Sequence, residues 1–227
     1  MMNAAEIRQF EHDLQDQMEA VFCPTHLSLG HEHVAVEIAQ ALMPDDWLYS
    51  THRNHHHYLA KGGNQAALWL EIMGSPHGIN GGFSGSQGIS DAALHFHASA
   101  IVGGLVGVAT GTAYALRDTG KVVVCVIGDA GTEQGVFWES LNFAVLHSLP
   151  IAYIVENNGK SVDAELHERQ ATPIKPRVQA FGVIVCDTVG RAIRTARLGL
   201  PSFHEAMVTL ECDHLNMSTL LPSLGLK

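Results

Sequence analysis

Two short apolar runs, each followed closely by polar residues, constrain the fold of this chain more than any other feature. The first run, residues 121–127, reads Lys-Val-Val-Val-Cys-Val-Ile and ends at Gly128-Asp129. The second run, residues 151–155, is followed by Glu156 and then by Asn157-Asn158. Short apolar runs bounded by turn residues are typical of buried strands in a parallel sheet. Because parallel strands end at the same edge, we expect Asp129 and Asn158 to lie close together.

These two side chains suggest a specific ligand. Carboxylate and amide oxygens are what a hard divalent cation requires. A helical stretch, residues 133–147, begins just after Asp129, and helix N-termini favour phosphate. Taken singly, Asp129 could cap that helix and Asn158 could belong to a turn before Gly159. Taken together, the residues indicate a diphosphate bridged by magnesium.

The second half of the chain alternates between strand and helix patterns. Strands are predicted at 121–127, 151–155, 183–187 and 205–212, and helices at 133–147, 176–181 and 190–198. Such alternation predicts an α/β fold, a doubly wound parallel sheet with helices on both faces.

The first half is predicted to be mostly helical, with helices at 7–21, 31–42 and 65–73, the last capped by Asn64. A glycine-rich loop follows at 74–88. Residues 101–116 read as a helix with many small residues, which indicates close packing inside the monomer or against another subunit. We expect one domain, 1–227, with helices and loop in 1–100, an α/β core in 101–212 and a tail in 213–227.

Composition narrows the possible partners. Charged residues make up 16% of the chain, against about 25% in typical soluble proteins, so a large core or a broad protein contact is expected. The net charge of −10 argues against nucleic acid and against an acidic membrane surface as partners.

The chain lacks both a membrane-length apolar run and a signal-peptide pattern. Four scattered cysteines fit free thiols in a reducing cytoplasm.

Four ordered blocks resemble one family. Gly128-Asp129 with Asn157-Asn158 is similar to the thiamine diphosphate motif, in which GDG precedes NN by about thirty residues. Residues 50–61 are similar to a segment with the pattern Tyr-Arg-x-His-Gly-His, and residues 99–104 to the turn that holds the aminopyrimidine. With residues 29–32 and 44–47, these blocks resemble the α subunit of 2-oxo acid dehydrogenase E1 components, the group of pyruvate, branched-chain and acetoin dehydrogenases.

The resemblance implies roles for the residues around the two strand ends. Asp129 and Asn158 would ligate Mg²⁺, together with the backbone carbonyl of Lys160. The backbone amides of Ala130 and Gly131, after the Gly128 turn, would contact the diphosphate.

It also implies roles for the two earlier blocks. His52 and Arg53 would bind the diphosphate. Ala100 and Val102 would hold the aminopyrimidine, with Val102 between the two rings of the cofactor. The histidines near the reaction centre would be His55 and His57.

Several positions depart from the family pattern. Ala130 replaces the second glycine of the motif, and His52 and Lys160 stand where tyrosines are usual. Gln87 replaces a loop histidine, and Glu211 takes an arginine position. The family's C-terminal helical region is expected to be missing.

The resemblance implies a subunit that needs a partner. In such split enzymes a β subunit supplies the glutamate that activates the pyrimidine. We therefore expect an α2β2 assembly with a β-like transketolase pyrimidine-domain subunit, acting on a 2-oxo acid or aldehyde. Three alternatives stay open: a carboligase or transketolase-like synthase, a non-catalytic stabilising subunit, and a zinc enzyme. The last would use two H-x-H pairs and a further histidine, namely His52, His55, His57, His95 and His97.

Overall fold

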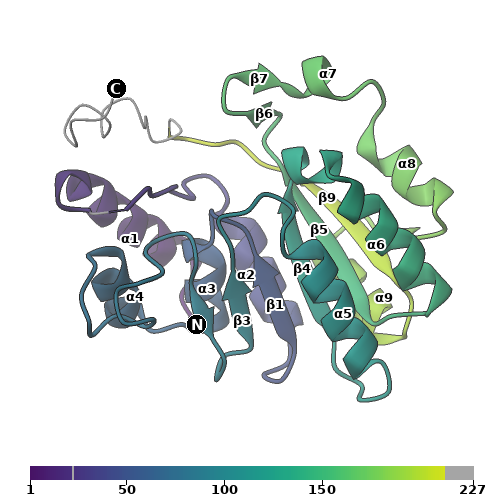
Figure 1. Cartoon of the computed structure of the whole chain (residues 1–227), viewed down its shortest axis with the longest axis horizontal. Coiled ribbons are helices and arrows are strands. Elements are labelled where there is room, and N and C mark those ends of the chain that lie inside the picture. Colours follow the sequence, from purple (N-terminus) through teal and green to yellow (C-terminus); the bar gives the residue numbers. More distant parts are fainter. Residues whose placement is uncertain (22, 213–227) are drawn as a thin grey trace.

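A seven-stranded sheet organises the chain, as the computed structural model shows for residues 1–21 and 23–212 (Figure 1). The strand order is β2-β3-β1-β4-β5-β9-β8. The central strands are β4 (Val123–Gly128) and β5 (Ile151–Asn157), with β1 (Trp47–Ser50) and β9 (Ser202–Met207) on either side. Next come β3 (Phe96–Ala98) and β8 (Ile184–Val185), also parallel, while β2 (Ser90–Asp91) pairs antiparallel with β3.

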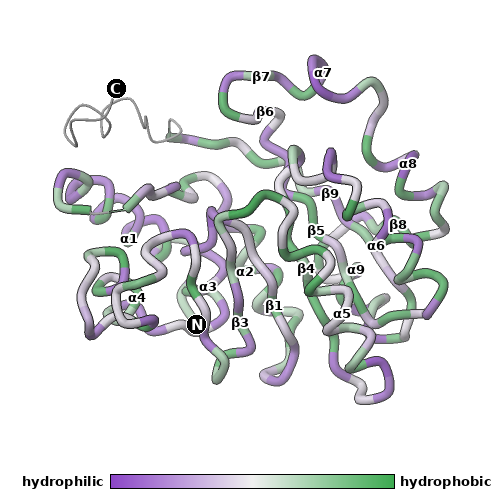
Figure 2. Tube along the Cα trace, viewed as in Figure 1, coloured by the Kyte–Doolittle hydropathy of each residue, from purple (hydrophilic) through white to green (hydrophobic). Residues whose placement is uncertain are grey.

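Helices cover both faces of this sheet because β4 and β5 are apolar on both sides. Val124 and Val126 pack with α2 (Glu32–Ala41) and α9 (Val189–Arg197) in one apolar cluster. Val123 and Cys125 pack in a second cluster, which includes α5 (Val106–Leu116) and α6 (Gly135–Leu146). Figure 2 shows the apolar character of β4 at the centre of the molecule. The predicted doubly wound α/β fold is confirmed.

Further helices enclose the first half of the sheet. They are α1 (Ala4–Asp16), the 3-10 turn η1 (Met18–Ala20), α3 (His55–Lys61) and α4 (Gln65–Ile72), all on the left of Figure 1. Asn64 caps α4 as predicted, since its side chain accepts a hydrogen bond from the Ala67 amide. The remaining elements are η2 (Asp129–Glu133), the β6 (Lys160–Ser161) and β7 (Ala164–Glu165) hairpin, α7 (Leu166–Arg169) and α8 (Ile174–Ala180).

Some predicted bounds were wrong. The helix predicted at 101–116 begins only at Val106, because residues 101–105 form a turn in which Gly103 has φ of +74°. The last strand was predicted at 205–212 and lies at Ser202–Met207. The tail predicted at 213–227 lies outside the described residues.

The structure also bears on the predictions about membrane spans and cysteines. In the described part of the chain, no helix has both the length and the apolarity needed to cross a bilayer. All four cysteines are free thiols.

Candidate functional site

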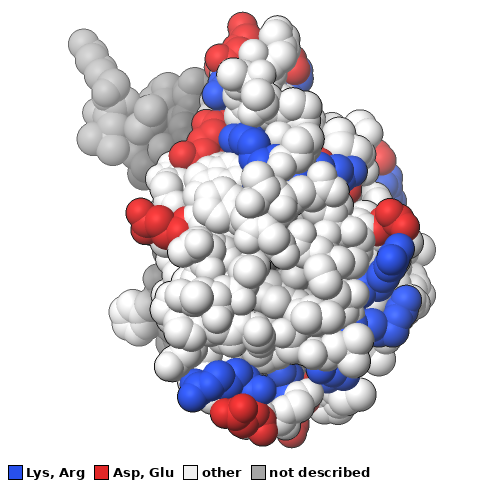
Figure 3. All heavy atoms as spheres, turned by 90° about the vertical axis from the view of Figure 1, so that its right-hand side faces the viewer, with Lys and Arg blue, Asp and Glu red and all other residues white. Residues whose placement is uncertain are grey.

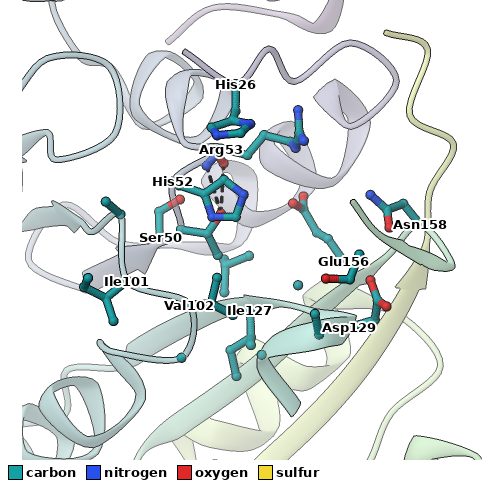
Figure 4. Close-up of a pocket in the computed structure, with 18 of the residues that line it drawn as sticks. His26, Ser50, His52, Arg53, Ile101, Val102, Ile127, Asp129, Glu156 and Asn158 are labelled. Atoms are coloured by element: carbon teal, nitrogen blue, oxygen red, sulfur yellow. Dashed lines mark hydrogen bonds between the residues drawn. The ribbon is translucent and has the colours of Figure 1, made fainter. Parts of the chain in front are cut away.

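A cavity of about 280 Å³ opens at the carboxyl ends of β1, β4 and β5 (Figure 4). The register of the sheet pairs Gly128 with Glu156, so the two strands end at the same level. All of the residues predicted to bind the cofactor line this cavity: His52, Arg53, Ala100, Val102, Gly128, Asp129, Ala130, Gly131, Asn158 and Lys160. The structure therefore brings together residues that lie more than a hundred positions apart in the sequence.

Asp129 lies where β4 passes into η2, and its side chain is almost fully buried, with 2% of its surface exposed. Arg169 from α7 donates to its Oδ2 at a distance of 2.5 Å. Burial raises the pKa of Asp129, and the Arg169 ion pair opposes that shift. The guanidinium of Arg169 therefore already places a positive charge beside this carboxylate.

Gly131 shapes the same turn. A Cβ atom on Gly131 would lie 2.3 Å from Cγ2 of Ile127, which is too close for any side chain. The absence of a side chain lets the turn pack tightly onto β4 and keeps Asp129 at the cavity.

Asn158 is set by the turn after β5. Asn157 donates to Glu205 on β9 at 2.7 Å and accepts a hydrogen bond from the Gly159 amide at 2.9 Å. Gly159 has φ of +79°, a conformation that glycine adopts without strain. The Asn158 side-chain oxygen accepts from the Lys160 amide at 3.0 Å, at the start of the β6–β7 hairpin. Both asparagines are therefore held by the backbone of one turn.

An apolar wall faces these polar residues. Figure 4 shows Ile101 and Val102 on one side of the cavity and Asp129 and Asn158 on the other. Ile101 is 70% exposed and Val102 is 45% exposed, which is unusual for large aliphatic side chains on a loop. This wall can contact the face of an aromatic ring.

His52 and Arg53 complete the cavity just after β1. Arg53 is buried, and its guanidinium donates to the carbonyl of Leu27. Burial lowers the pKa of Arg53. The ring of His52 packs edge-on against His26, with 4.7 Å between the ring centroids. Arg53 is a donor suited to phosphate oxygens.

His55 and His57 lie in α3, fully buried, and they are not among the residues that line the cavity. The ring nitrogens of His55 lie 3.2 Å from Glu11 and 2.8 Å from Ser86. Nδ1 of His57 lies 2.9 Å from the Ser50 hydroxyl. Their role near the reaction centre stays a prediction.

Glu156 and His31 are among the lining residues that sequence reasoning missed. The position of Glu156, directly before Asn157 at the end of a buried strand, was the signal that could have found it. Among the described residues, the side chains that lie close enough to share a metal ion are His31, His56 and Glu156. This group differs from the five histidines of the zinc hypothesis.

The residues present fit the cofactor that the resemblance implies. Asp129, Asn158 and the Lys160 carbonyl offer oxygen ligands of the kind that Mg²⁺ takes. Arg53 suits a diphosphate, and Val102 suits an aromatic ring system. The cavity thus offers separate places for a metal, a diphosphate and an apolar ring.

Comparisons with known proteins agree with this geometry. Residues 2–185 match the family model described as the dehydrogenase E1 component. The α subunit of an acetoin:2,6-dichlorophenolindophenol oxidoreductase from Bacillus subtilis is 38% identical, over 92% of this chain and 68% of the relative. The α subunit of a pyruvate dehydrogenase E1 component from Porphyra purpurea is 33% identical, over 76% of this chain and 53% of the relative.

A solved structure supports the fold. A transketolase from Campylobacter jejuni matches with a TM-score of 0.67 and 18% identity, over 90% of this chain and 37% of that chain. The matched regions make up 68% and 53% of the two curated relatives, so this chain corresponds to part of each. On the family match and these relatives, the chain belongs to the dehydrogenase E1 component family.

Proposed function

We propose that this chain is the α-like subunit of a thiamine diphosphate enzyme that decarboxylates a 2-oxo acid and passes on the acyl or aldehyde unit. The observation that carries the proposal is the cavity in which Asp129 and Asn158, from adjacent strand ends, face the apolar wall at Val102. The relative named as a pyruvate dehydrogenase component supports a 2-oxo acid as the substrate, whereas acetoin, the compound in the name of the other relative, is a hydroxy ketone without a carboxyl group.

The chain's own residues would bind and orient the cofactor. Asp129, Asn158 and the Lys160 carbonyl would hold Mg²⁺ against the diphosphate, and Arg53 would donate to its oxygens. Val102 would fix the angle between the two rings. When bound, thiamine diphosphate supplies the nucleophilic carbon and the electron sink for decarboxylation.

A partner subunit would complete the site. Large apolar side chains on α5 and α6 are exposed, among them Val108, Tyr114, Phe143 and Leu146. Figure 3 shows a broad area without charged side chains on the side of the molecule where these helices lie. Such a surface suits a stable protein interface. We propose that it packs against other subunits of an α2β2 assembly, including a β-like subunit.

The test is decarboxylation of a panel of 2-oxo acids, measured with the chain alone and with a co-expressed β-like subunit. The chain alone should show no turnover, because loss of an acid–base group costs about 10²–10⁴-fold and part of the cofactor surface is missing. Adding the partner should restore turnover, and Arg53→Ala should then raise the cofactor concentration needed for half-maximal rate.

A matched control is Arg191→Ala, which removes an exposed arginine on α9 that pairs with Asp187. Its cofactor requirement should equal that of the unmodified chain. Robust turnover by the isolated chain would contradict the proposal, because the pyrimidine would then be activated within this chain.

A further inference from the structure

Beneath the proposed cofactor cavity lies a buried carboxylate surrounded by imidazoles. Glu156 is 5% exposed, and His31, His56 and His57 are at most 2% exposed. Nδ1 of His31 lies 3.1 Å from Oε2 of Glu156, and Nε2 of His56 lies 3.2 Å from Oε1. Nε2 of His57 lies 3.3 Å from the same Oε1. The start of α2, helix α3 and strand β5 are far apart in the sequence, and their side chains meet at one carboxylate.

Not every buried polar atom of this cluster has a hydrogen-bond partner among the described residues. Within the described residues, Nε2 of His57 has no hydrogen-bond partner although it is buried next to Glu156. Its other nitrogen is engaged with Ser50 at 2.9 Å. If that nitrogen donates to Ser50, the lone pair of Nε2 faces the carboxylate, which is repulsive unless a cation lies between them. A buried polar atom left unpaired costs about 1–3 kcal/mol.

We propose that His31, His56 and Glu156 form a binding site for a transition-metal ion such as Zn²⁺, separate from the magnesium site at Asp129. Two imidazoles and one carboxylate are a known ligand set for zinc, with one position left open. The coordinating atoms of these three side chains all lie within 4.8 Å of one another. His57 is placed to act as a fourth ligand or to orient Glu156.

The distances agree with such a site. Ligand atoms about 2.1 Å from a tetrahedral zinc ion lie roughly 3.4 Å from one another. Nδ1 of His31 lies 3.1 Å from Oε2 of Glu156 and Nε2 of His56 lies 3.2 Å from Oε1, so each imidazole is already close to that value from one oxygen of the carboxylate. The three coordinating atoms lie within 4.8 Å of one another, so the side chains must move closer together for all three to bind one ion.

The ligand chemistry separates this site from the magnesium site. Imidazole nitrogens favour Zn²⁺, Co²⁺ and Ni²⁺, whereas Asp129 and Asn158 offer only oxygens, which favour Mg²⁺. His31 and Glu156 also line the cavity, which gives an ion a route to the site. Figure 4 shows Glu156 near Asp129 in the cavity.

Cobalt tests the site because tetrahedral Co²⁺ has a strong visible spectrum. The whole purified chain, stripped of metal by a chelator, is titrated with Co²⁺ without thiamine diphosphate. We expect a tetrahedral spectrum that saturates at one equivalent. His31→Gln and His56→Gln should each weaken Co²⁺ binding by at least about 100-fold, more than the loss of a supporting residue outside the ligand set.

Two control variants separate the loss of this metal site from other effects of a substitution. His33→Gln changes an exposed histidine in the first turn of α2, two residues after His31, and should leave the spectrum unchanged. Asp129→Ala should also leave it unchanged while abolishing any stabilisation by thiamine diphosphate with Mg²⁺. The proposed function can therefore fail while the metal site stands, and the reverse also holds.

A crystal soaked with Zn²⁺ gives a test that needs no variant. Anomalous scattering at the zinc edge should give a peak between His31, His56 and Glu156. A peak elsewhere, or a Co²⁺ spectrum that is absent or equally strong in both glutamine variants, would overturn the proposal. It would mean that the imidazoles and Arg53 alone neutralise Glu156.

Discussion

Among single residues, Gly131 determines how closely the turn after β4 can approach the strand. The space for its missing side chain is taken by Ile127, at 2.3 Å from the expected Cβ position. Gly128, three residues earlier, has nothing within 4 Å of the same position. The two glycines of this turn therefore have different physical roles.

Gly131→Ala should destabilise the chain by about 1–3 kcal/mol, because a methyl group is forced into an already filled space. Gly128→Ala, with an ordinary φ of −74° and open space, should cost less than about 1 kcal/mol. Urea unfolding measures both. In an Ile127→Ala background the cost of Gly131→Ala should shrink. Equal costs for the two glycine variants would rule out the steric explanation.

A second residue-scale prediction concerns Glu11, which is fully buried and accepts from Ser28 at 2.5 Å. Burial alone would raise the pKa of Glu11, but His55 and Ser28 outweigh it and lower that pKa. A lowered folded pKa contributes stability that is present above the unfolded value, near 4.5. That stability is lost as the pH falls through the folded pKa.

Glu11→Gln should therefore cost about 1–3 kcal/mol at pH 7, because it removes a buried carboxylate that is stabilised by hydrogen bonds. The cost should decrease as the pH falls below about 4.5, where the unmodified glutamate also loses its advantage. Urea unfolding at several pH values measures this, with the exposed Glu19→Gln as control. A cost that does not vary with pH would show that Glu11 contributes through shape alone.

The sequence predicted the oxygen-bearing side chains of the cavity because Asp129 and Asn158 follow apolar strands directly. It did not predict the cluster at Glu156, because His31 and His56 lie 125 and 100 positions from Glu156. A histidine in a polar segment gives no sign that it will be buried. Only the packing of α2 and α3 against the sheet brings these side chains to one carboxylate.

Among the helices and strands, α5 shows most clearly how the residues of an element match the surfaces that it packs against. Gly107, Gly111 and Ala115 recur every four residues and are exposed, while Ala109 and Ala113 are buried against the sheet. The buried alanines explain the contact within the monomer. The exposed stripe has no neighbour among the described residues at Gly111, where a Cβ would meet nothing within 4 Å.

Gly111→Leu is therefore expected to fold normally and to prevent assembly, because a leucine fits the monomer but not a close helix contact with another subunit. Size-exclusion chromatography with light scattering measures the assembly state. The control is Gly111→Ala, which adds only a methyl group at the same exposed position. Normal assembly of Gly111→Leu would place the subunit contact elsewhere.

The buried helices and strands were predicted correctly where their residues are apolar. Burial was not predicted where it depends on hydrogen bonds between polar side chains that are far apart in the sequence. The core strands β4 and β5 are continuous apolar runs, so their pattern was sufficient. The helix α3 reads His-His-His-Tyr-Leu-Ala-Lys and is nonetheless almost entirely buried. Its histidines are buried because Glu11, Ser86 and Glu156 lie beside them, which no local pattern reveals.

At the scale of the whole molecule, the sheet joins two halves that bring different chemistry to one cavity. The half that contains β4 and β5 supplies Asp129 and Asn158, and the half that contains β1 supplies His52 and Arg53. The parallel register of β1 with β4 holds these two groups at one edge. We propose that this edge binds thiamine diphosphate with Mg²⁺.

Thermal unfolding with and without thiamine diphosphate and Mg²⁺ tests that claim most directly, for the chain alone and with its partner. A ligand at one hundred times its Kd adds about 2.7 kcal/mol, and about 2–4 °C per kcal/mol gives a rise in Tm of roughly 5–10 °C. Asp129→Ala should abolish the rise, and Asp163→Ala, an exposed aspartate between β6 and β7, should keep it. An unchanged Tm at saturating cofactor, both alone and with the partner, would contradict the account.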